Sequence, residues 1–260
     1  MNEDNFLKVA KEAAIEAGGI ISKYFGKKHQ YKFKSEDKSD FATQADLESE
    51  QKIIQILTKN FPDHNIIAEE SGVVDKGSEY TWVIDPLDGT ISFAAGMPYF
   101  AVSIGLLKAN KPILGVIYQV LAKDLYWAQV NKGAYLNGKK IEVSKKDRLT
   151  VATMVLDFGH LKRREPKVNL YILPLFKKAG YIYAVGSASL SLALVAKGVQ
   201  DGSVIQAWIW DFAAGAVIVR EAGGMVTDFE GNEPDWTKDR LNVMTSNGLI
   251  HNQILEALKR

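Results

Sequence analysis

The sequence WVIDPLDGTISF, residues 82–93, puts two carboxylates at the end of an apolar segment and a glycine directly after them. The apolar residues at 80–84 predict a buried strand. Asp85 and Asp88 therefore follow the point where the chain leaves the core, which is where α/β proteins place their ligand sites. Two acids three residues apart at such a place are suited to bind one cation.

The residues around these two acids favour the approach of an anion. Pro86 restricts the backbone, and Gly89 lets a ligand come close to the main chain. The amides of Gly89 and Thr90 are free to face an anion. Asp, Gly and Thr are also common in turns and helix caps, so the pattern alone leaves a turn that caps the next helix as the other interpretation.

Acids recur at two more places where apolar segments end. Glu69 and Glu70 follow the run 65–68, and Asp211 follows the apolar segment 204–210. Because burying a lone carboxylate is costly, we expect Asp211 to be paired, hydrogen-bonded or bound to a metal. The alternative for Asp211 is an N-cap of the helix that begins at the next residue.

The composition is that of an ordinary globular chain near charge neutrality. Of 260 residues, 47% are hydrophobic and 24% charged, and 32 Lys and Arg balance 31 Asp and Glu, which excludes disorder, collagen and a general polyanion binder. The absence of Cys excludes disulfides, zinc–thiolate sites and a cysteine nucleophile. The N-terminus lacks a signal-peptide pattern and no apolar run is long enough to span a bilayer, so we expect a cytoplasmic protein with no membrane partner.

Apolar spacing predicts one α/β layered domain over residues 1–260. The helical period covers 6–25 and recurs from Asp46 to Asn60, and a polar, Lys-rich loop at 32–40 separates the two helices. Short β-rich runs at 65–138 predict a mixed or antiparallel sheet. We divide the domain into an N-terminal α+β lobe at about 1–145 and a C-terminal α/β lobe at about 146–260. In the C-terminal lobe we expect strands at 150–158, 181–187, 204–211, 225–229 and 242–247. We expect its helices at 168–180, 189–198, 213–224 and 249–260.

The residue types narrow the chemistry to hydrolysis assisted by a hard cation. Oxygen ligands without Cys favour Mg²⁺, Mn²⁺ or Ca²⁺ over zinc or copper, and such carboxylate clusters usually serve phosphoryl transfer. The GxxxxGK[ST] motif, the kinase motif set and the GxSxG motif are all absent. The polar or terminal settings of the four histidines predict surface side chains at His29, His64, His160 and His251.

Two segments resemble the signature sequences of the inositol monophosphatase family. Residues 82–93 resemble its first signature, and WDFAAGAVIVREAGG, residues 210–224, resembles its second. Further matches in the family's order are DFATQAD (40–46), AEESG (68–72), PYFAVSIGL (98–106), GAYLNG (133–138) and GSASLSLALVAKG (186–198). The resemblance covers nearly the whole chain. It implies an α-β-α-β-α sandwich, usually a homodimer, that hydrolyses phosphate monoesters with Mg²⁺ and is commonly Li⁺-sensitive.

The resemblance also implies the metal ligands. Glu69, Asp85 and the carbonyl of Leu87 would bind one Mg²⁺, while Asp85, Asp88 and Asp211 would bind a second. A weakly held third Mg²⁺ near Glu69 is a further expectation, and Mn²⁺ is a substitute metal. Two cations about 4 Å apart neutralise a phosphate dianion, activate water and stabilise the leaving alkoxide.

The remaining site residues follow from the same resemblance. Thr90 with Asp46 resembles the pair that orients and deprotonates the attacking water, and Glu70 resembles an acid that supports the metal ligands. Lys34 or Lys38 would supply the Lys found before the DxxTxxD element. The start of the helix at 186–188 would point its positive end at the site. The residues expected at the substrate are Leu87, Asp88, Gly89, Thr90, Gly186, Ser187, Ala188 and Asp211.

The departures from the family pattern lie at residues that would contact the alcohol part of the substrate. In inositol-specific members a Glu shortly before the WD motif binds substrate hydroxyls, whereas residues 204–209 contain no acid and Ile205 or Gln206 occupies its place. The Thr-Asn expected after DGT is Ile91-Ser92. These changes leave the metal chemistry intact, and they affect the choice of alcohol.

The sequence therefore supports a ranked set of functions. The first is hydrolysis of myo-inositol monophosphate, followed by fructose 1,6-bisphosphate or a broad range of sugar phosphates, and then nucleotide 3′-phosphates or histidinol phosphate. The alternative from another class is a non-catalytic regulatory protein, since some bacterial relatives contact the transcription machinery. So many mutually repelling acids argue against a scaffold alone, and we expect no nucleic acid to be required.

Overall fold

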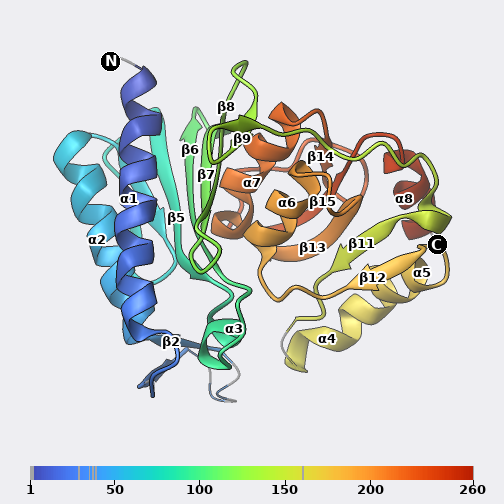
Figure 1. Cartoon of the computed structure of the whole chain (residues 1–260), viewed down its shortest axis with the longest axis horizontal. Helices are drawn as coiled ribbons and strands as arrows, with labels where there is room; N and C mark the ends of the chain where they lie inside the picture. Colours follow the sequence, from blue (N-terminus) through green and yellow to red (C-terminus); the bar gives the residue numbers. More distant parts are fainter. Residues whose placement is uncertain are drawn as a thin grey trace.

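Helices and sheets alternate in five layers in the computed structural model (Figure 1). The structure describes residues 3–28, 30–34, 36, 38, 40–159 and 161–259. The outer helices α1 (Glu3–Tyr24) and α2 (Gln44–Asn60) cover one face of an eight-stranded sheet. Helices α6 (Ala188–Ala196) and α7 (Ile209–Glu221) lie between this sheet and a five-stranded one, as the α-β-α-β-α prediction requires.

The eight-stranded sheet is mixed, as predicted. Its order is β10-β9-β8-β7-β6-β5-β3-β4, and only β3 and β5 pair in parallel. Its strands are β3 (Asn65–Ala68), β4 (Gly72–Val74), β5 (Tyr80–Asp88), β6 (Ala101–Lys108), β7 (Lys111–Gln119), β8 (Asp124–Gln129), β9 (Ala134–Leu136) and β10 (Lys139–Lys140). A separate hairpin of β1 (Tyr31–Phe33) and β2 (Phe41–Thr43) leads into α2.

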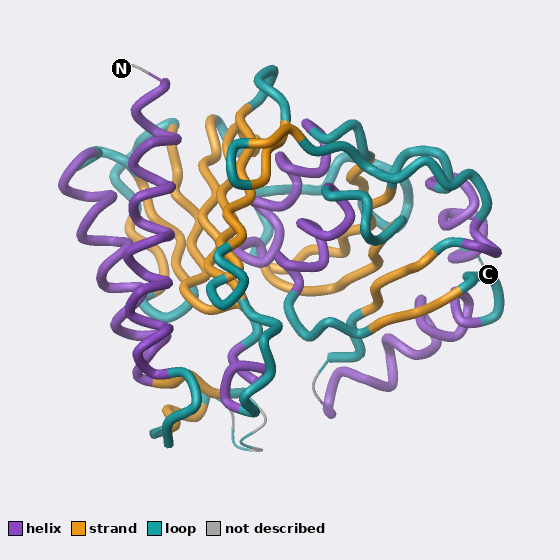
Figure 2. The backbone as a smooth tube through the Cα atoms, in the orientation of Figure 1, coloured by secondary structure: helices purple, strands orange, loops and turns teal. Residues whose placement is uncertain are grey.

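The five-stranded sheet has the order β12-β11-β13-β15-β14. Its strands are β11 (Thr153–Leu156), β12 (Tyr181–Tyr183), β13 (Gly202–Trp208), β14 (Met225–Thr227) and β15 (Arg240–Ser246). Residues 141–148 connect the two sheets as an extended loop (Figure 2). The outer face is covered by the 3₁₀ turn Leu149–Val151, α4 (Leu161–Lys167), the π-helical turn Val168–Ile172, α5 (Leu173–Phe176) and α8 (His251–Leu258).

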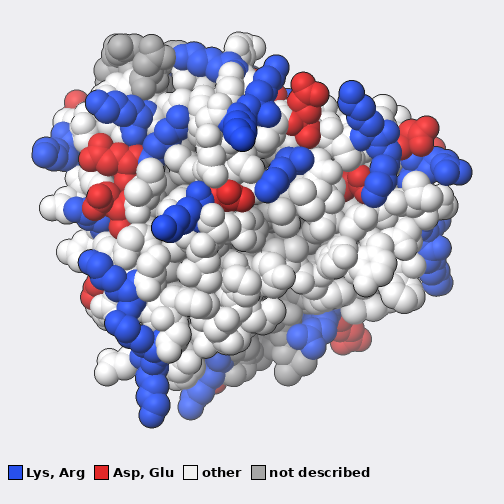
Figure 3. Space-filling model, in the orientation of Figure 1, with Lys and Arg blue, Asp and Glu red and all other residues white. Residues whose placement is uncertain are grey.

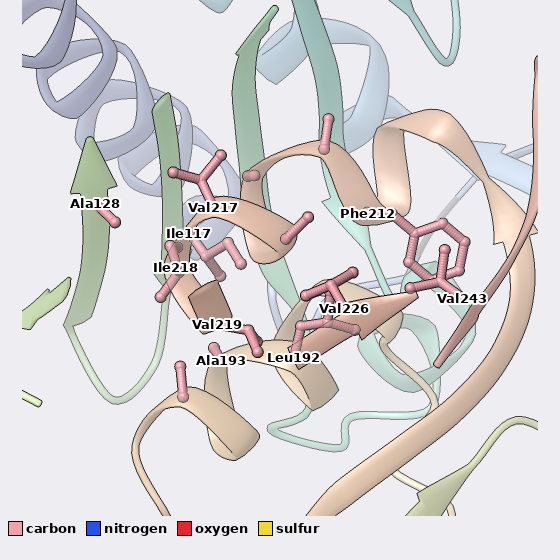
Figure 4. Close-up of a cluster of buried hydrophobic side chains, with 14 of the residues drawn as sticks. Ile117, Ala128, Leu192, Ala193, Phe212, Val217, Ile218, Val219, Val226 and Val243 are labelled. Atoms are coloured by element: carbon pink, nitrogen blue, oxygen red, sulfur yellow. The ribbon is translucent and has the colours of Figure 1, made fainter. Parts of the chain in front are cut away.

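The central core fixes α7 between the two sheets. Phe212 and Val217 of α7, Leu192 of α6 and Ile117 of β7 belong to one buried cluster (Figure 4). Glycine at position 115 of β7 lets the helix come this close, because a Cβ there would lie 2.1 Å from the carbonyl oxygen of Ala214. The packing holds the start of α7 against the sheet.

The structure corrects several local predictions. The helix expected at 168–180 is already helical from Leu161 and ends at Phe176, so Gly180 does not close it. The short elements β4, β10 and α3 (Thr90–Ala94) were not predicted, because each is too short to repeat a hydrophobic period. The division into lobes near residue 145 stays a prediction.

The surface assignment of the histidines is wrong for two of them. His64 stacks between Phe61 and Tyr80 in the core under α1. His251 is buried between the hydroxyls of Thr227 and Ser246, which lie 3.0 and 2.8 Å from its ring nitrogens. The other two, His29 and His160, lie outside the described residues.

Charged side chains of both signs are interspersed over the face in Figure 3, around a largely uncharged centre. This mixture agrees with the near-zero net charge of the sequence. Among the described helices, none combines the length and apolar content needed to cross a bilayer.

Candidate active site

Three buried aspartates from two distant segments converge beside the end of β5. Asp85, Asp88 and Asp211 each offer a carboxylate oxygen, and these oxygens all lie within 4.8 Å of one another. Alternate residues of a regular strand share a face, so residues three apart would point to opposite faces. The pairing of β5 with β6 shifts register between Asp85 and Asp88, and this irregularity allows both side chains to serve one site.

Asp88 is held by the start of α6. Its Oδ2 accepts hydrogen bonds from the hydroxyl of Ser187 at 2.6 Å, the hydroxyl of Ser189 at 2.6 Å and the amide of Ser189 at 2.7 Å, and its Oδ1 accepts from the amide of Ala188 at 3.2 Å. Burial raises the pKa of the Asp88 carboxyl, and these donors oppose that rise. The positive end of α6 therefore lies at the site, as predicted, and there it stabilises a carboxylate.

Asp211 lies in the first turn of α7 and does not cap it from outside. Its Oδ2 accepts from the backbone amide of Trp208 at 2.7 Å, and the helix begins at Ile209. The alternative that Asp211 is an N-cap is therefore wrong by position. Its place in the turn still satisfies one free amide at the helix start.

The carboxylates repel one another in this setting. Burial raises the pKa of Asp85 and Asp211 well above the usual range for aspartate, and the charges of Glu69 and Asp88 raise both further. A cation would remove this repulsion. Because every donor is a hard oxygen and the group is nearly closed to solvent, the residues present fit Mg²⁺ or Mn²⁺.

Asp46 and Thr90 are in direct contact. The hydroxyl of Thr90 lies 2.9 Å from Oδ1 of Asp46 and 3.0 Å from the carbonyl oxygen of Leu87. The other oxygen of Asp46 accepts from the amide and hydroxyl of Thr43, which caps α2. Burial raises the pKa of Asp46 to about 6 despite these hydrogen bonds. Asp46 is thus a fixed carboxylate with a pKa suited to proton transfer near neutrality.

Of the two candidate lysines, Lys34 is the one that the structure places against the predicted acids. Lys34 Nζ donates to Oε1 of Glu69 at 2.7 Å and also to Glu70. Burial works against the Lys34 charge, yet these two acids raise its pKa above the usual value. Lys38 instead lies over the ring of Phe33. Burial raises the pKa of Glu69 to about 7.

A cavity of about 560 Å³ is lined by the aspartate cluster, by Glu69 and Thr90, and by residues of both sheets. Gly89 shapes its floor with φ of +95°, and a Cβ there would lie 2.6 Å from the carbonyl oxygen of Tyr99. The predicted residues that line the cavity are Glu69, Asp85, Leu87, Asp88, Gly89, Thr90, Gly186, Ser187, Ala188 and Asp211. Asp46 and Glu70 lie behind this lining and reach it through Thr90 and Glu69.

The wall away from the aspartate cluster carries aromatic and basic side chains and the carboxylate of Asp157, which is paired with Lys167. Trp208 and Trp210 stack with ring centroids 5.1 Å apart, and Arg240 lies over the Trp208 ring. Ile205 is fully buried, and the Gln206 amide donates to Asn242 at 2.8 Å. Neither residue presents a carboxylate to the cavity, in agreement with the sequence departure noted above.

Sequence reasoning missed three contributors to this site. Thr43 carries a findable signal, because Thr43 and Asp46 have the spacing of a capping box. Ser189 carries no such signal, because the group that it contacts, Asp88, is distant in sequence. Trp208 carries none either, because only the fold brings its side chain to the cavity.

The chain is similar to one family throughout. The model of the inositol monophosphatase family matches residues 2–260. A fructose-1,6-bisphosphatase/inositol-1-monophosphatase of Aquifex aeolicus is 38% identical over 261 residues, which cover 100% of this chain and 97% of the relative. The Nus factor SuhB of Pasteurella multocida is 36% identical over 238 residues, 90% of this chain and 89% of that protein. The crystal structure of the extragenic suppressor protein suhB from Bartonella henselae has a TM-score of 0.92 at 33% identity, covering 98% of this chain and 99% of that one.

Proposed function

Because the chain belongs to the inositol monophosphatase family, we propose that it is a Mg²⁺-dependent phosphatase whose substrate is myo-inositol monophosphate. The observation that carries this proposal is the convergence of Asp85, Asp88 and Asp211 in a cavity that Thr90 also lines, with the Thr90 hydroxyl bonded to Asp46 behind it. Alternatives among substrates are fructose 1,6-bisphosphate and a broader set of sugar phosphates. The Aquifex aeolicus relative, whose name includes both activities, supports keeping them.

The ligand sets are those implied by the family. Glu69, Asp85 and the Leu87 carbonyl would hold one Mg²⁺, and Asp85, Asp88 and Asp211 a second. Bound cations would neutralise the phosphate dianion, lower the pKa of the attacking water and stabilise the leaving oxygen. Glu69 contributes to this arrangement through its position beside Asp85, whose pKa its charge raises. The third, weaker ion would lie near Glu69.

The chain's own groups supply the proton transfer. The Thr90 hydroxyl has one proton, with which it donates a hydrogen bond to Asp46 or to the Leu87 carbonyl, so its lone pairs remain free to accept a hydrogen bond from water. When the hydroxyl donates to Asp46, the attacking water transfers its proton to the Thr90 oxygen while Thr90 passes its own proton to the Asp46 carboxylate. The hydrogen bonds from Thr43 hold the carboxylate in that orientation.

The phosphate has donors on two sides. The amides of Gly89 and Thr90 lie at the N-terminus of α3. On the other side, the segment at the start of α6 lines the cavity with Gly186, Ser187 and Ala188. The amides of Ala188 and Ser189 already donate to Asp88. We therefore assign phosphate binding mainly to the α3 side, with α6 acting through its dipole.

Three further expectations belong to the same proposal. We propose a homodimer in the cytoplasm that is sensitive to Li⁺. The exposed side chains of Phe176 on α5 and of Tyr181 and Tyr183 on the edge strand β12 supply an apolar surface for the partner. Light scattering should give twice the chain mass. Phe176→Asp should shift the protein toward monomer. If Phe176→Asp has the same mass as wild type, this surface is not the dimer interface.

A regulatory role without catalysis is the competing function, since a relative at 36% identity is named a Nus factor. A scaffold has no need for three buried aspartates within 4.8 Å of one another. The deciding experiment is phosphate release from inositol 1-phosphate, fructose 1,6-bisphosphate, glycerol 2-phosphate, a nucleoside 3′-phosphate and histidinol phosphate, with and without Mg²⁺. Release of phosphate from inositol 1-phosphate is expected, and no release from any ester would reject the catalytic function.

A further inference from the structure

Glu50 is a buried acid that belongs to neither the aspartate cluster nor the cavity lining. It lies on α2 four residues after Asp46, so the two side chains share one face of the helix. Only 3% of Glu50 is exposed. A carboxylate is rarely buried to this degree without partners, so its contacts should explain its place.

The contacts of Glu50 are with the main chain that follows Glu69. Its Oε2 accepts a hydrogen bond from the backbone amide of Glu70 at 2.8 Å, and the side chain and amide of Ser71 also donate to it. Hydrogen bonds to an ionised acceptor are shorter and stronger than neutral ones. The Glu50 carboxylate therefore accepts hydrogen bonds from Glu70 and Ser71, whose donors would otherwise lack a partner in this turn.

That turn is fixed from two sides. The amide of Glu69 donates to the carbonyl oxygen of Ile84 at 3.2 Å, and Ile84 directly precedes Asp85 on β5. On the other side Glu50 joins the turn to α2, the helix that carries Asp46. The backbone of Glu69 is thus tied both to the strand that carries Asp85 and to the helix that carries Asp46.

We propose that Glu50 is a positioning residue for the cation site, which holds the Glu69–Glu70 turn so that Glu69 faces Asp85. This inference rests on the proposed metal-dependent function and deepens it. Glu50 touches neither the cation nor the substrate, and it acts through Glu69. Residues that orient metal ligands in this way commonly contribute about 10- to 100-fold to metal affinity.

The test uses two substitutions of Glu50 and a matched control. Glu50→Ala removes all acceptors, whereas Glu50→Gln keeps one acceptor oxygen at the same reach. Glu48→Ala is the control, because Glu48 also lies on α2 and accepts hydrogen bonds, from Tyr24 at 2.7 Å and Gln44 at 2.9 Å, but does not contact the turn. Mg²⁺ binding to the metal-free protein is measured by titration calorimetry. Phosphate release is measured against Mg²⁺ concentration.

We expect Glu50→Ala to weaken Mg²⁺ binding by about 10-fold or more, and to raise the Mg²⁺ concentration at half-maximal rate by a similar factor. At saturating Mg²⁺ the maximal rate should recover to within about threefold of wild type. Glu50→Gln should lie between Glu50→Ala and wild type, and Glu48→Ala should match wild type. If Glu50→Ala does not fold, Glu50→Gln decides the matter through the same two readouts.

Two outcomes would overturn the proposal. One is Mg²⁺ affinity within twofold of wild type in whichever Glu50 variant folds. The other is an equal loss of affinity in Glu48→Ala, which would indicate a general effect on α2. Because calorimetry needs no substrate, a wild-type protein that binds Mg²⁺ but releases no phosphate would reject the proposed phosphatase and leave the Glu50 test intact.

Discussion

The two ends of the cavity are built on different principles. At the phosphate end, charged groups are buried, hydrogen-bonded to fixed backbone and confined by β5, α6 and α7. At the end that we assign to the alcohol, Trp208 stacks on Trp210 and lies under Arg240, and residues 204–209 carry no acid. The Asp157 carboxylate also lines this end, where it is paired with Lys167. The chemistry of the first end tolerates little change, because its charges must cancel. The second end is free to vary, which is why the reaction is easier to infer than the substrate.

The largest expected effect is at the phosphate end. Asp211→Asn should reduce phosphate release by about 10³-fold or more, since loss of a cation ligand forfeits several kcal/mol of charge stabilisation. The asparagine oxygen can still accept from the Trp208 amide, so the fold should remain, with a Tm in Mg²⁺-free buffer no lower than that of wild type. Asp88→Asn is a less specific test, because the asparagine NH₂ group is itself a donor and would face the donating hydroxyls of Ser187 and Ser189. Residual activity above a tenth of wild type in Asp211→Asn would contradict the ligand assignment.

The Asp46–Thr90 pair should show the next largest effect. Thr90→Ala and Asp46→Asn should each lower kcat by about 10²- to 10⁴-fold with Mg²⁺ affinity largely retained. Because the two groups act as a unit, the double variant should lose little more than the worse single one. Single-turnover rates on all three variants make the comparison, and fully multiplicative losses would show two independent roles.

Substitution at the alcohol end should change selectivity more than rate. With no acidic acceptor among residues 204–209, kcat/KM for inositol 1-phosphate, fructose 1,6-bisphosphate and glycerol 2-phosphate should agree within about 10²-fold. Gln206→Glu should shift the ratio toward inositol 1-phosphate. Ile205 is a poor site for the same change, because its side chain is buried and a glutamate there would lack solvent and partners. A preference for inositol 1-phosphate above about 10³-fold in wild type would mean that another residue supplies the contact.

His251 lies outside both ends of the cavity, so its substitution should change only the stability of the fold. We expect this to be the smallest of the effects. Burial lowers the pKa of His251 from its usual 6.5, so the folded state favours the neutral ring. Its contribution to stability is then present above pH 6.5 and decreases as the pH falls below that value, where the unfolded chain takes up a proton first. The difference in Tm between wild type and His251→Gln should therefore shrink from pH 8 to pH 5.5. An unchanged difference would contradict the assignment.

Local patterns singled out the three aspartates that the structure brings together. Asp85, Asp88 and Asp211 follow apolar segments, and such segments end where sheets meet their ligands. Thr90 and Asp46 required the family resemblance, because 44 residues separate them and no local period relates them. Lys34 and Lys38 stayed alternatives, because the reach of a lysine depends on the direction in which its loop leaves the hairpin.

Other features depend on packing between distant segments. His64 lies in a polar stretch, yet Phe61 and Tyr80 enclose it, and Tyr80 comes from another element. Glu50 has the appearance of an ordinary surface acid in a polar helix, and only the turn at Glu70 gives it a partner. In both cases the sequence shows the residue and the fold supplies its surroundings.

The central claim is that a cation held by the buried aspartates drives phosphate release. The most direct test measures phosphate release from inositol 1-phosphate in Mg²⁺ and in excess chelator, with wild type and Asp211→Asn side by side. We expect release by wild type in Mg²⁺ only, restored when Mg²⁺ is added back, and negligible release by Asp211→Asn in both. Full activity of wild type in excess chelator would contradict it.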